Sequence, residues 1–411
     1  MEKIVIKNGN IVTMAGFSHG PQKGEEFGKL GLIEDGAIVI SDGVIEEVGP
    51  TKDIEIPNGA KVFDVKGRLV TPGLIDPHTH LAHFGSREKE YTWRIEGMPY
   101  IEILKNGGGI LETVRQNRIA SEGEIFNQSL ENLSRMISFG VTTVESKSGY
   151  GLDWETELKQ LKTNKRLEQE TNIDVVSTFL GAHAIPTEFK EDPEEFVQKV
   201  IEMLPKAKEY ATYCDVFCEE GVFTPDQSER ILLEAKKLGY KVKLHADEIV
   251  ATGGAQLAAK LGADSADHLL CVDDEGMNMM AEKEVVAVLL PGTSFNLMSD
   301  KYAPAQSMIE KQVPIALATD FNPGSCPTEN PQLVMTLACL NLKLTPSQAL
   351  AAFTINAAHS VGMGEKVGSI EEGKQGDVVV FDCPNVDYIP YRFGINHTHS
   401  VFKKGKLIWQ K

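Results

Sequence analysis

The middle of the chain alternates short apolar runs with longer amphipathic segments. Apolar positions in the longer segments recur every three to four residues, which predicts helices over 110–119, 155–170, 192–210, 226–238 and 252–261. The apolar runs between them predict eight strands. Strands alternating with helices over about 250 residues are typical of a (β/α)8 barrel of the TIM type, an α/β fold. The predicted strands end near His80, Glu145, His183, Glu220, His245, Leu270, Gly292 and Asp320.

The two ends of the chain have a different pattern, in which short strands are broken by turns. Strands are predicted at 4–6, 37–40 and 44–48 near the N-terminus, with an Asp42-Gly43 turn between the last two. Near the C-terminus they are predicted at 377–382, 400–403 and 407–409. We therefore expect residues 1–66 and 367–411 to form one small composite β-sandwich domain, and residues 67–366 to form the barrel.

Two histidines follow the first predicted barrel strand. The apolar stretch that begins at Leu69 runs into His78 and His80, which are separated by one residue. Side chains two apart on a strand point to the same side, so both imidazoles face one way and supply half of a metal site. A lone His-x-His pair is more often structural. Here Asp76 and Pro77 precede the pair at a strand end, which favours a metal site.

Further histidines and one aspartate fall at other predicted strand ends. His183, His245, His268 and Asp320 each end an apolar run. Any one of them alone is more often a core or helix-cap residue, but side-chain packing hardly explains such residues at five strand ends of one barrel. A carboxylate that ends an apolar strand also needs a partner. We predict a site for zinc or iron with four ligands: His78, His80, His245 and Asp320.

A metal held this way has an open position for water. The metal lowers the pKa of that water towards neutrality and so makes a hydroxide nucleophile. Asp320 is a candidate acceptor for the proton of the water. Glu248, three residues after His245, is a candidate to carry protons to a leaving nitrogen. The alternative for Glu248 is a solvated loop carboxylate, and its position alone does not separate the two.

Composition and charge limit which classes of binding partner and which cellular location the sequence favours. The chain is 42% hydrophobic and 24% charged, which is ordinary for a soluble globular protein, and no apolar stretch approaches the roughly 20 residues of a membrane span. Its formal charge of −18 argues against nucleic acid or an anionic membrane as partner. The first residues lack the apolar core of a signal peptide. The six cysteines form no CxxC pair, which indicates buried thiols and a cytoplasmic location.

The remaining histidines are expected to be structural or on the surface. The pair His397 and His399 repeats the His-x-His spacing but lies in the β-rich end without a partner carboxylate, so we set it aside. The glycines at 107–109 lack the Gly-Lys-Ser/Thr of a phosphate loop and indicate a flexible turn. The other histidines set aside are His19, His83 and His359.

Several stretches resemble the amidohydrolase superfamily, and the resemblance runs over nearly the whole chain. Val70 to His80 is similar to the first-strand signature of that superfamily, whose usual architecture is a barrel with a split β domain. Within it, the chain resembles the imidazolonepropionase family. The stretches that carry this second resemblance are His83 to Arg87, Gly107 to Ile110, Ser146 to Leu152, Leu244 to Glu248 and Ala318 to Ser325.

The resemblance implies a reaction and roles for residues. That family hydrolyses 4-imidazolone-5-propanoate, a small molecule, to N-formimidoyl-L-glutamate in histidine degradation with one Zn2+ or Fe3+ per subunit, and a homodimer is expected. Arg87 would pair with the propionate carboxylate, as suits a guanidinium; without the resemblance it reads as a surface arginine. Glu248 would move protons, and His268 would position the nucleophile or the developing oxyanion. The remaining implied substrate contacts are Tyr150, His183, Asn322, Gly324 and Ser325.

One feature differs from the binuclear members of the superfamily, which carry a bridging lysine or glutamate at a strand end. The fourth predicted strand ends with Glu219 and Glu220 and has no lysine, which favours a single metal, although either glutamate stays open as a bridge.

Two other functions stay open. A mononuclear deaminase or other ring hydrolase acting on an uncharged base would not need Arg87. A catalytically dead barrel used as a scaffold should have lost a ligand, yet all four are present.

Overall fold

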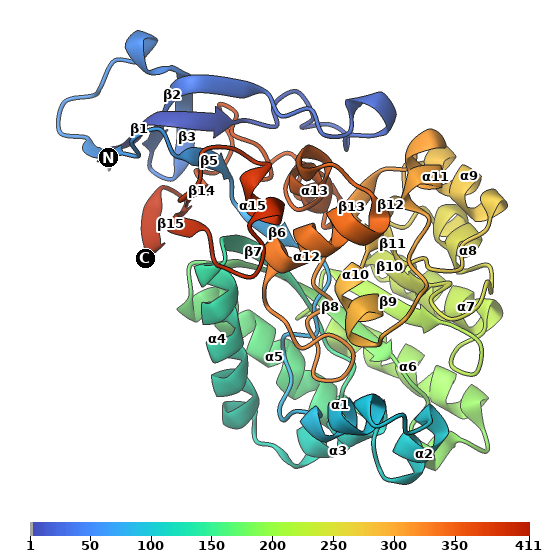
Figure 1. The fold of residues 1–411 in the computed structure, drawn as a ribbon. Coiled ribbons are helices and arrows are strands. Elements are labelled where there is room, and N and C mark those ends of the chain that lie inside the picture. Colours follow the sequence, from blue (N-terminus) through green and yellow to red (C-terminus); the bar gives the residue numbers. More distant parts are fainter. Residues whose placement is uncertain (1–2) are drawn as a thin grey trace.

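A computed structural model of the chain describes residues 3–411, which form two eight-stranded sheets (Figure 1). One sheet is an all-parallel barrel, and the other is a mixed sheet built from both ends of the chain. The predicted fold class, a TIM-type barrel with a small composite β domain, is therefore confirmed. The exact residue limits of the two domains stay a prediction.

The barrel strands follow one another in chain order, and each pairs in parallel with the next. The inner strands are buried almost throughout, as expected when helices cover one face and side chains fill the other. All eight predicted strands are present. They are β6 (Leu74–Asp76), β7 (Val141–Lys147), β8 (Asp174–Ala182), β9 (Tyr213–Cys218), β10 (Lys241–Ala246), β11 (Ser265–His268), β12 (Val286–Leu289) and β13 (Ile315–Leu317).

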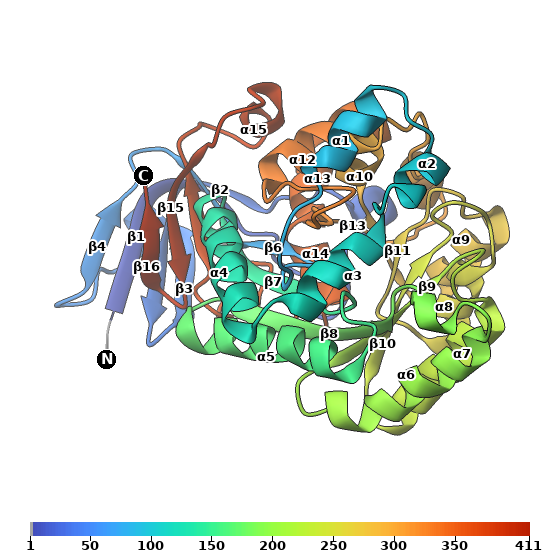
Figure 2. The ribbon, with the colours of Figure 1, turned by 90° about the horizontal axis from the view of Figure 1, so that it is seen from below.

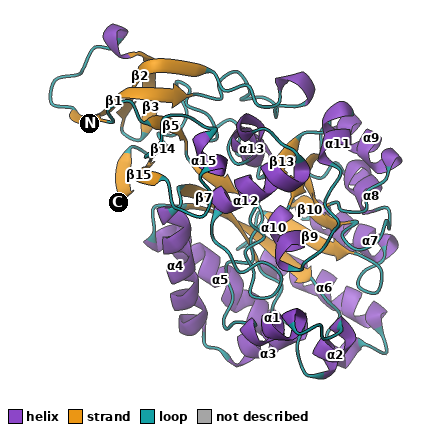
Figure 3. Ribbon diagram, in the orientation of Figure 1, coloured by secondary structure: helices purple, strands orange, loops and turns teal. Residues whose placement is uncertain are grey.

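Helices surround the barrel (Figure 3). Local sequence fixes where they begin: the Asp153 side chain caps α5, and Thr224 forms a capping box with Gln227 at the start of α7. The five predicted helices are present as α3 and α5 to α8. The helices are α1 (Glu88–Ile95), α2 (Tyr100–Lys105), α3 (Ile110–Ile119), α4 (Glu122–Ser138), α5 (Trp154–Glu170), α6 (Pro193–Ala207), α7 (Pro225–Lys237), α8 (Gly254–Leu261), α9 (Asp274–Lys283), α10 (Pro291–Asn296), α11 (Ala305–Glu310), α12 (Pro331–Leu337), α13 (Pro346–Ala352), α14 (Ile355–Ser360) and α15 (Tyr388–Tyr391). None of the helices in the described part of the chain is long and apolar enough to cross a membrane.

The mixed sheet brings the two ends of the chain together. Figure 2 shows the blue N-terminal strands beside the red C-terminal strands at one end of the molecule. The order is β16-β15-β14-β5-β1-β2-β3, and β4 pairs with β1. The strands are β1 (Lys3–Val12), β2 (Leu32–Ser41), β3 (Val44–Pro50), β4 (Lys61–Asp64), β5 (Leu69–Pro72), β14 (Val378–Phe381), β15 (Thr398–Lys403) and β16 (Lys406–Gln410).

The apolar stretch that begins at Leu69 is not one strand but two. Its first half, β5, pairs with β1 and β14 in the mixed sheet, and its second half, β6, starts the barrel. Gly73 lies between the halves and packs against Thr142, whose side chain would clash with any Cβ at that position. A glycine is therefore needed where the chain passes from one sheet to the other.

A buried ion-pair cluster joins the two sheets. Lys403 of β15 is buried, and its Nζ lies 2.6 Å from both Asp174 Oδ2 and Asp377 Oδ2. Lys404 Nζ lies 2.9 Å from the other oxygen of Asp174. Asp174 is the first residue of barrel strand β8, so these contacts tie the small domain to the barrel.

Candidate active site

The barrel closes at the segments that carry the predicted metal ligands. The N–H of Asp320 donates to the carbonyl oxygen of His78 (3.1 Å), and the N–H of His80 donates to that of Phe321 (2.8 Å). With the bridge between Thr79 and Phe321, these bonds join the segment after the first barrel strand to the segment after the last. The backbone therefore sets His78, His80 and Asp320 side by side at the C-terminal end of the barrel.

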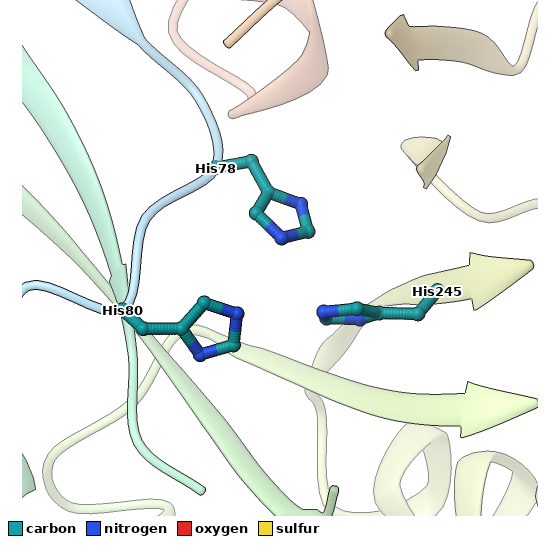
Figure 4. Close-up of side chains that lie close together, drawn as sticks. All are labelled: His78, His80 and His245. Carbon is teal, nitrogen blue, oxygen red and sulfur yellow. The ribbon is translucent and has the colours of Figure 1, made fainter. Parts of the chain in front are cut away.

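Three histidine side chains converge inside this end of the barrel (Figure 4). His245 lies near the end of β10 and faces His78 and His80. The ring centroid of His78 lies 4.6 Å from that of His245 and 5.5 Å from that of His80, and His80 and His245 are 5.7 Å apart. All three side chains are buried.

Several ring nitrogens in this cluster lack a protein partner. Among the described residues, Nε2 of His78, Nδ1 of His80 and Nε2 of His245 are buried without a hydrogen bond. One donor atom from each of these histidines lies within 4.8 Å of the others, and the same holds for His78, His268 and Asp320. Burial holds the pKa of His78 and of His80 well below the usual value, so both rings are neutral, which is the metal-binding form. Imidazole and carboxylate donors in this arrangement fit a metal ion.

Asp320 lies against the histidine pair. Its Oδ1 is 3.5 Å from His78 Nε2 and 3.7 Å from His80 Nε2, while the Thr293 hydroxyl donates to its Oδ2 (2.6 Å). Burial raises the pKa of Asp320 to about 6. Its backbone has a φ of 53°, in the left-handed region, and such strain in a non-glycine residue is common at functional sites.

Two aspartates behind the cluster orient two of the rings. Asp267 Oδ2 lies 2.6 Å from Nδ1 of His78, which leaves Nε2 of that ring to face the cluster. Asp215 Oδ2 lies 3.0 Å from Nδ1 of His245, and its Oδ1 accepts from the His245 backbone N–H (3.2 Å). Carboxylates behind metal-binding imidazoles fix the ring orientation and raise the basicity of the ligand.

A buried lysine links these two aspartates. Lys147 Nζ lies 2.8 Å from Asp215 Oδ2, 2.8 Å from Glu145 Oε1 and 3.6 Å from Asp267 Oδ2. Burial alone would lower the pKa of Lys147, but the carboxylates, Asp215 first, outweigh it and raise that pKa. The side chain is therefore a fixed cation beneath the histidine cluster.

Sequence reasoning missed this charged layer. Glu145 and Lys147 are two residues apart on β7, and Asp215 and Asp267 lie within β9 and β11. The available signal was charged residues inside otherwise apolar strands, at positions where burial demands a partner.

Glu248 and His268 are neighbours and line the same cavity. Glu248 Oε1 is 3.4 Å from His268 Nδ1, and burial, with the nearby Asp320 carboxylate, raises the pKa of Glu248 to about 8. The segment that carries Glu248 is held by Glu219, whose carboxylate accepts from the backbone N–H groups of Ile249 (2.9 Å) and Val250 (3.3 Å). Glu219, which the sequence left open as a metal bridge, therefore binds backbone instead.

Tyr150 and His183 form one wall beside His80. The His183 ring stacks on that of His80, with centroids 4.7 Å apart and an interplanar angle of 10°. The Tyr150 ring lies 5.4 Å from His80 and 5.3 Å from His183. The Tyr150 loop is held by Glu157, which accepts from the backbone N–H groups of its neighbours Gly149, Gly151 and Leu152.

Arg87 lines the same cavity as His80 and His245. Its Nε and Nη2 donate to the two carboxylate oxygens of Glu90, both at 2.8 Å. The guanidinium passes so close to Gly324 that any side chain at this position would clash with it. Arg87 is therefore a partly buried, oriented group and not a loose surface arginine.

The loop after β13 is organised by Asn322. Its Nδ2 donates to the carbonyl oxygen of Asp320 (2.7 Å), and its Oδ1 accepts from the N–H groups of Gly324 (2.9 Å) and Ser325 (2.8 Å). Much of the hydrogen-bonding capacity of the Asn322 side chain is thus used within its own loop.

A cavity of about 310 Å3 brings the predicted residues together. His78 is the exception, because it is fully buried and does not line the cavity. His397, which we set aside, instead contacts the Arg392 carbonyl oxygen in the β domain. The predicted residues that line the cavity are His80, Arg87, Tyr150, His183, His245, Glu248, His268, Asp320, Asn322, Gly324 and Ser325.

The chain is similar in sequence to proteins named imidazolonepropionase. The chain is 54% identical to an imidazolonepropionase of Alkaliphilus oremlandii (strain OhILAs) over 401 residues, covering 96% of this chain and 95% of the relative. It is 50% identical to an imidazolonepropionase of Fusobacterium nucleatum subsp. nucleatum over 408 residues, covering 98% of each.

Two solved structures share the architecture at low identity. Guanine deaminase of E. coli superposes with a TM-score of 0.74 at 16% identity and full coverage of both chains. The 5-methylcytosine deaminase of Klebsiella pneumoniae gives a TM-score of 0.76 at 17% identity, covering 99% of this chain and 98% of the other. These two structures support the fold alone. Residues 69–408 match the model of the amidohydrolase family, and with the relatives above this shows that the chain belongs to that family and groups with its imidazolonepropionases.

Proposed function

We propose that this protein hydrolyses the cyclic amide C–N bond of 4-imidazolone-5-propanoate to give N-formimidoyl-L-glutamate, a step of histidine degradation. The observation that carries the proposal is a small cavity lined both by members of a metal-type donor cluster and by an oriented arginine, Arg87. A volume of about 310 Å3 suits a small ring with a short acidic tail.

The ligands of the metal would be His78, His80, His245 and Asp320. Imidazole and carboxylate donors suit zinc or iron, and we propose one Zn2+ or Fe3+ per subunit. When bound, such an ion supplies Lewis-acid chemistry and lowers the pKa of water enough to provide a nucleophile at neutral pH. The Asp215 and Asp267 carboxylates support this role, because they hold two of the rings in place.

The chain's own residues would bind the substrate and move protons. Arg87 would pair with the propionate carboxylate, with Tyr150, His183, Asn322, Gly324 and Ser325 around the rest of the molecule. Hydrolysis adds an oxygen to the ring carbonyl carbon and a proton to the departing nitrogen. Asp320 or Glu248 would accept the water proton, and Glu248 would deliver one to that nitrogen.

Glu248 suits this double role because of its environment. Burial raises the pKa of its carboxyl to about 8, so the group is poised to give and take a proton near neutral pH. The contact between Glu248 and His268 supports a role for His268 in holding the nucleophile or the developing oxyanion.

We also propose a cytoplasmic location and a homodimer. The six cysteines are free thiols, which is typical of a reducing compartment. Size-exclusion chromatography with light scattering would test the dimer.

Turnover of freshly prepared 4-imidazolone-5-propanoate tests the proposed reaction. We expect loss of its ultraviolet absorbance and formation of N-formimidoyl-L-glutamate with metal-replete protein. Chelation and His245→Ala should both abolish turnover. His399→Ala is the matched control, because His399 lies in the small domain and should leave the rate unchanged. Absence of turnover by metal-replete protein would exclude the proposed substrate and favour a deaminase or another ring hydrolase.

A further inference from the structure

Helix α1 and the residue just before it present three charged side chains to one end of the cavity. Arg87, Glu90 and Arg94 are spaced at i, i+3 and i+7, which places them on one face of a helix. All three line the cavity. Two guanidinium groups therefore face a single carboxylate, and one positive charge is left without a protein counter-ion among the described residues at this end.

Arg87 uses the whole carboxylate of Glu90. Glu90 Oε1 accepts from Arg87 Nε, and Oε2 accepts from Arg87 Nη2, both at 2.8 Å. The backbone N–H of Gly109 also donates to Oε1 (2.8 Å). Glu90 is buried, so this carboxylate is occupied by Arg87 and by the turn that precedes α3.

Arg94 has unused hydrogen-bonding capacity. Its Nη2 donates to the carbonyl oxygen of Gly324 (3.2 Å), but among the described residues its Nε is buried and has no hydrogen-bond partner. An arginine with a purely structural role would be expected to satisfy its buried N–H groups, because an unpaired one costs free energy. Because Arg94 lines the cavity, its guanidinium with this unpaired donor is suited to an anionic group that binds there.

Gly324 connects the two arginines. The Arg87 guanidinium lies where a Cβ of residue 324 would be, so a larger residue there would displace it, and Arg94 Nη2 donates to the carbonyl oxygen of Gly324. Both guanidiniums therefore reach the same loop position in the cavity wall.

We propose that Arg94 is a second carboxylate-binding residue, which acts with Arg87 on the acidic tail of the substrate and sets the preference for an acid over its neutral analogue. The proposal rests on the proposed function, because it assigns a further residue to the propionate end of that site. Arg87 is fixed in place by Glu90, and Arg94 supplies the charge that the substrate carboxylate neutralises.

The test uses two stable ring analogues that differ only in the tail. Calorimetry on metal-loaded protein would give the Kd of 3-(imidazol-4-yl)propanoate and of its carboxamide. Wild type should bind the acid more tightly. Arg94→Leu should weaken binding of the acid by about 10- to 100-fold and leave the amide within about twofold, because only the acid loses a charge-assisted hydrogen bond.

Two further variants keep the test decisive. Arg94→Lys retains the charge but loses the planar fork, so its acid affinity should lie between those of wild type and Arg94→Leu. Arg135→Leu is the matched control: Arg135 pairs with Glu329 (2.7 Å) and does not line this cavity, so the acid-to-amide ratio should not change. Circular dichroism would establish that each variant is folded.

The outcomes separate this inference from the proposed reaction. Equal weakening of acid and amide in folded Arg94→Leu or Arg94→Lys, or no preference for the acid in wild type, would overturn the role of Arg94. Failure of wild type to hydrolyse 4-imidazolone-5-propanoate, with an acid preference that disappears in Arg94→Leu, would reject the proposed substrate and leave the carboxylate site standing.

Discussion

Lys147 is a lysine that solvent does not reach, and it holds the two aspartates behind the histidine cluster. Its ammonium group touches Asp215 and Asp267, and each aspartate orients one imidazole. Without this cation, three carboxylates would be buried close together and would repel one another. The positions of the two rings therefore depend on a residue that touches neither of them.

Replacement of Lys147 by methionine should weaken metal binding. We expect an apparent metal affinity about 10- to 100-fold lower, the usual effect of disturbing groups behind metal ligands. Competition with a chromophoric chelator would measure it. Lys403→Met is the matched control, since Lys403 is also buried between two aspartates but lies in the small domain. Loss of metal affinity in both variants would indicate a global effect of stability and refute a specific role for Lys147.

At the scale of single residues, sequence reasoning identified the histidines and the aspartate at strand ends. It did not identify the charged residues that hold them in place. His78, His80, His245 and Asp320 were found because parallel strands in a barrel bring their ends together. Lys147 is the last residue of β7 and Asp267 lies within β11, and their pairing depends on which strands are neighbours and which faces point inward. Arg94 was missed because it lies on a short helix that the apolar pattern did not predict.

At the scale of elements, the contact between β8 and β15 links the barrel to the small domain through Asp174. Burial alone would raise the pKa of Asp174, but Lys403, Lys404 and Gln375 outweigh it and leave that pKa lowered. A carboxyl with a lowered folded pKa stabilises the protein at pH values above its ordinary pKa of 3.8. This stabilisation is lost as the pH falls through the folded value.

Asp174→Asn should therefore destabilise the protein in a pH-dependent way. We expect a loss of about 1–3 kcal/mol in the free energy of unfolding at pH 7, since the ammonium groups lose a charged partner. The difference from wild type should shrink as the pH drops below 3.8. Urea unfolding between pH 3 and 7 would measure it.

Asp382→Asn provides the comparison. Asp382 pairs with Arg68 at the surface, where it is 49% exposed, so this change should cost about 0.5 kcal/mol or less. A constant difference between wild type and Asp174→Asn at every pH would contradict an ionic role for Asp174.

The elements themselves were largely predictable. Strands β6 to β13 follow apolar runs, and α5 to α8 follow helical periodicity, so the alternating pattern was sufficient for the barrel. The change of sheet at Gly73 was not predicted, because both β5 and β6 are apolar and buried, and local sequence does not state which neighbour a strand will pair with.

For the whole molecule, a metal at this site would connect the first and last barrel strands. His78 and His80 follow β6, whereas Asp320 follows β13, and these segments close the barrel. A ligand that binds only the folded state adds stability, about 2.7 kcal/mol when its free concentration is 100 times its Kd. A bound ion should therefore stabilise the closed barrel as a unit.

Removal of the metal should lower the Tm by at least several degrees. Differential scanning calorimetry of metal-loaded and chelated protein would measure the shift. His245→Ala should melt at the same temperature with and without chelator, because it lacks one of the ligands. A chelator effect of equal size in that variant would place the stabilising ion elsewhere.

The pairing of β5 has a consequence for how the protein is made. Its neighbours are β1, synthesised earlier, and β14, synthesised after the whole barrel, and the N–H of Gly73 donates to the carbonyl oxygen of Asp377. Pairs so distant in sequence form late, since closing long loops costs entropy. In a ribosome-bound chain that still lacks β14, the His78 segment would therefore follow a strand, β5, that has not yet paired with β14. We expect metal insertion to follow release from the ribosome, and a stalled nascent chain that lacks β14 should retain little metal.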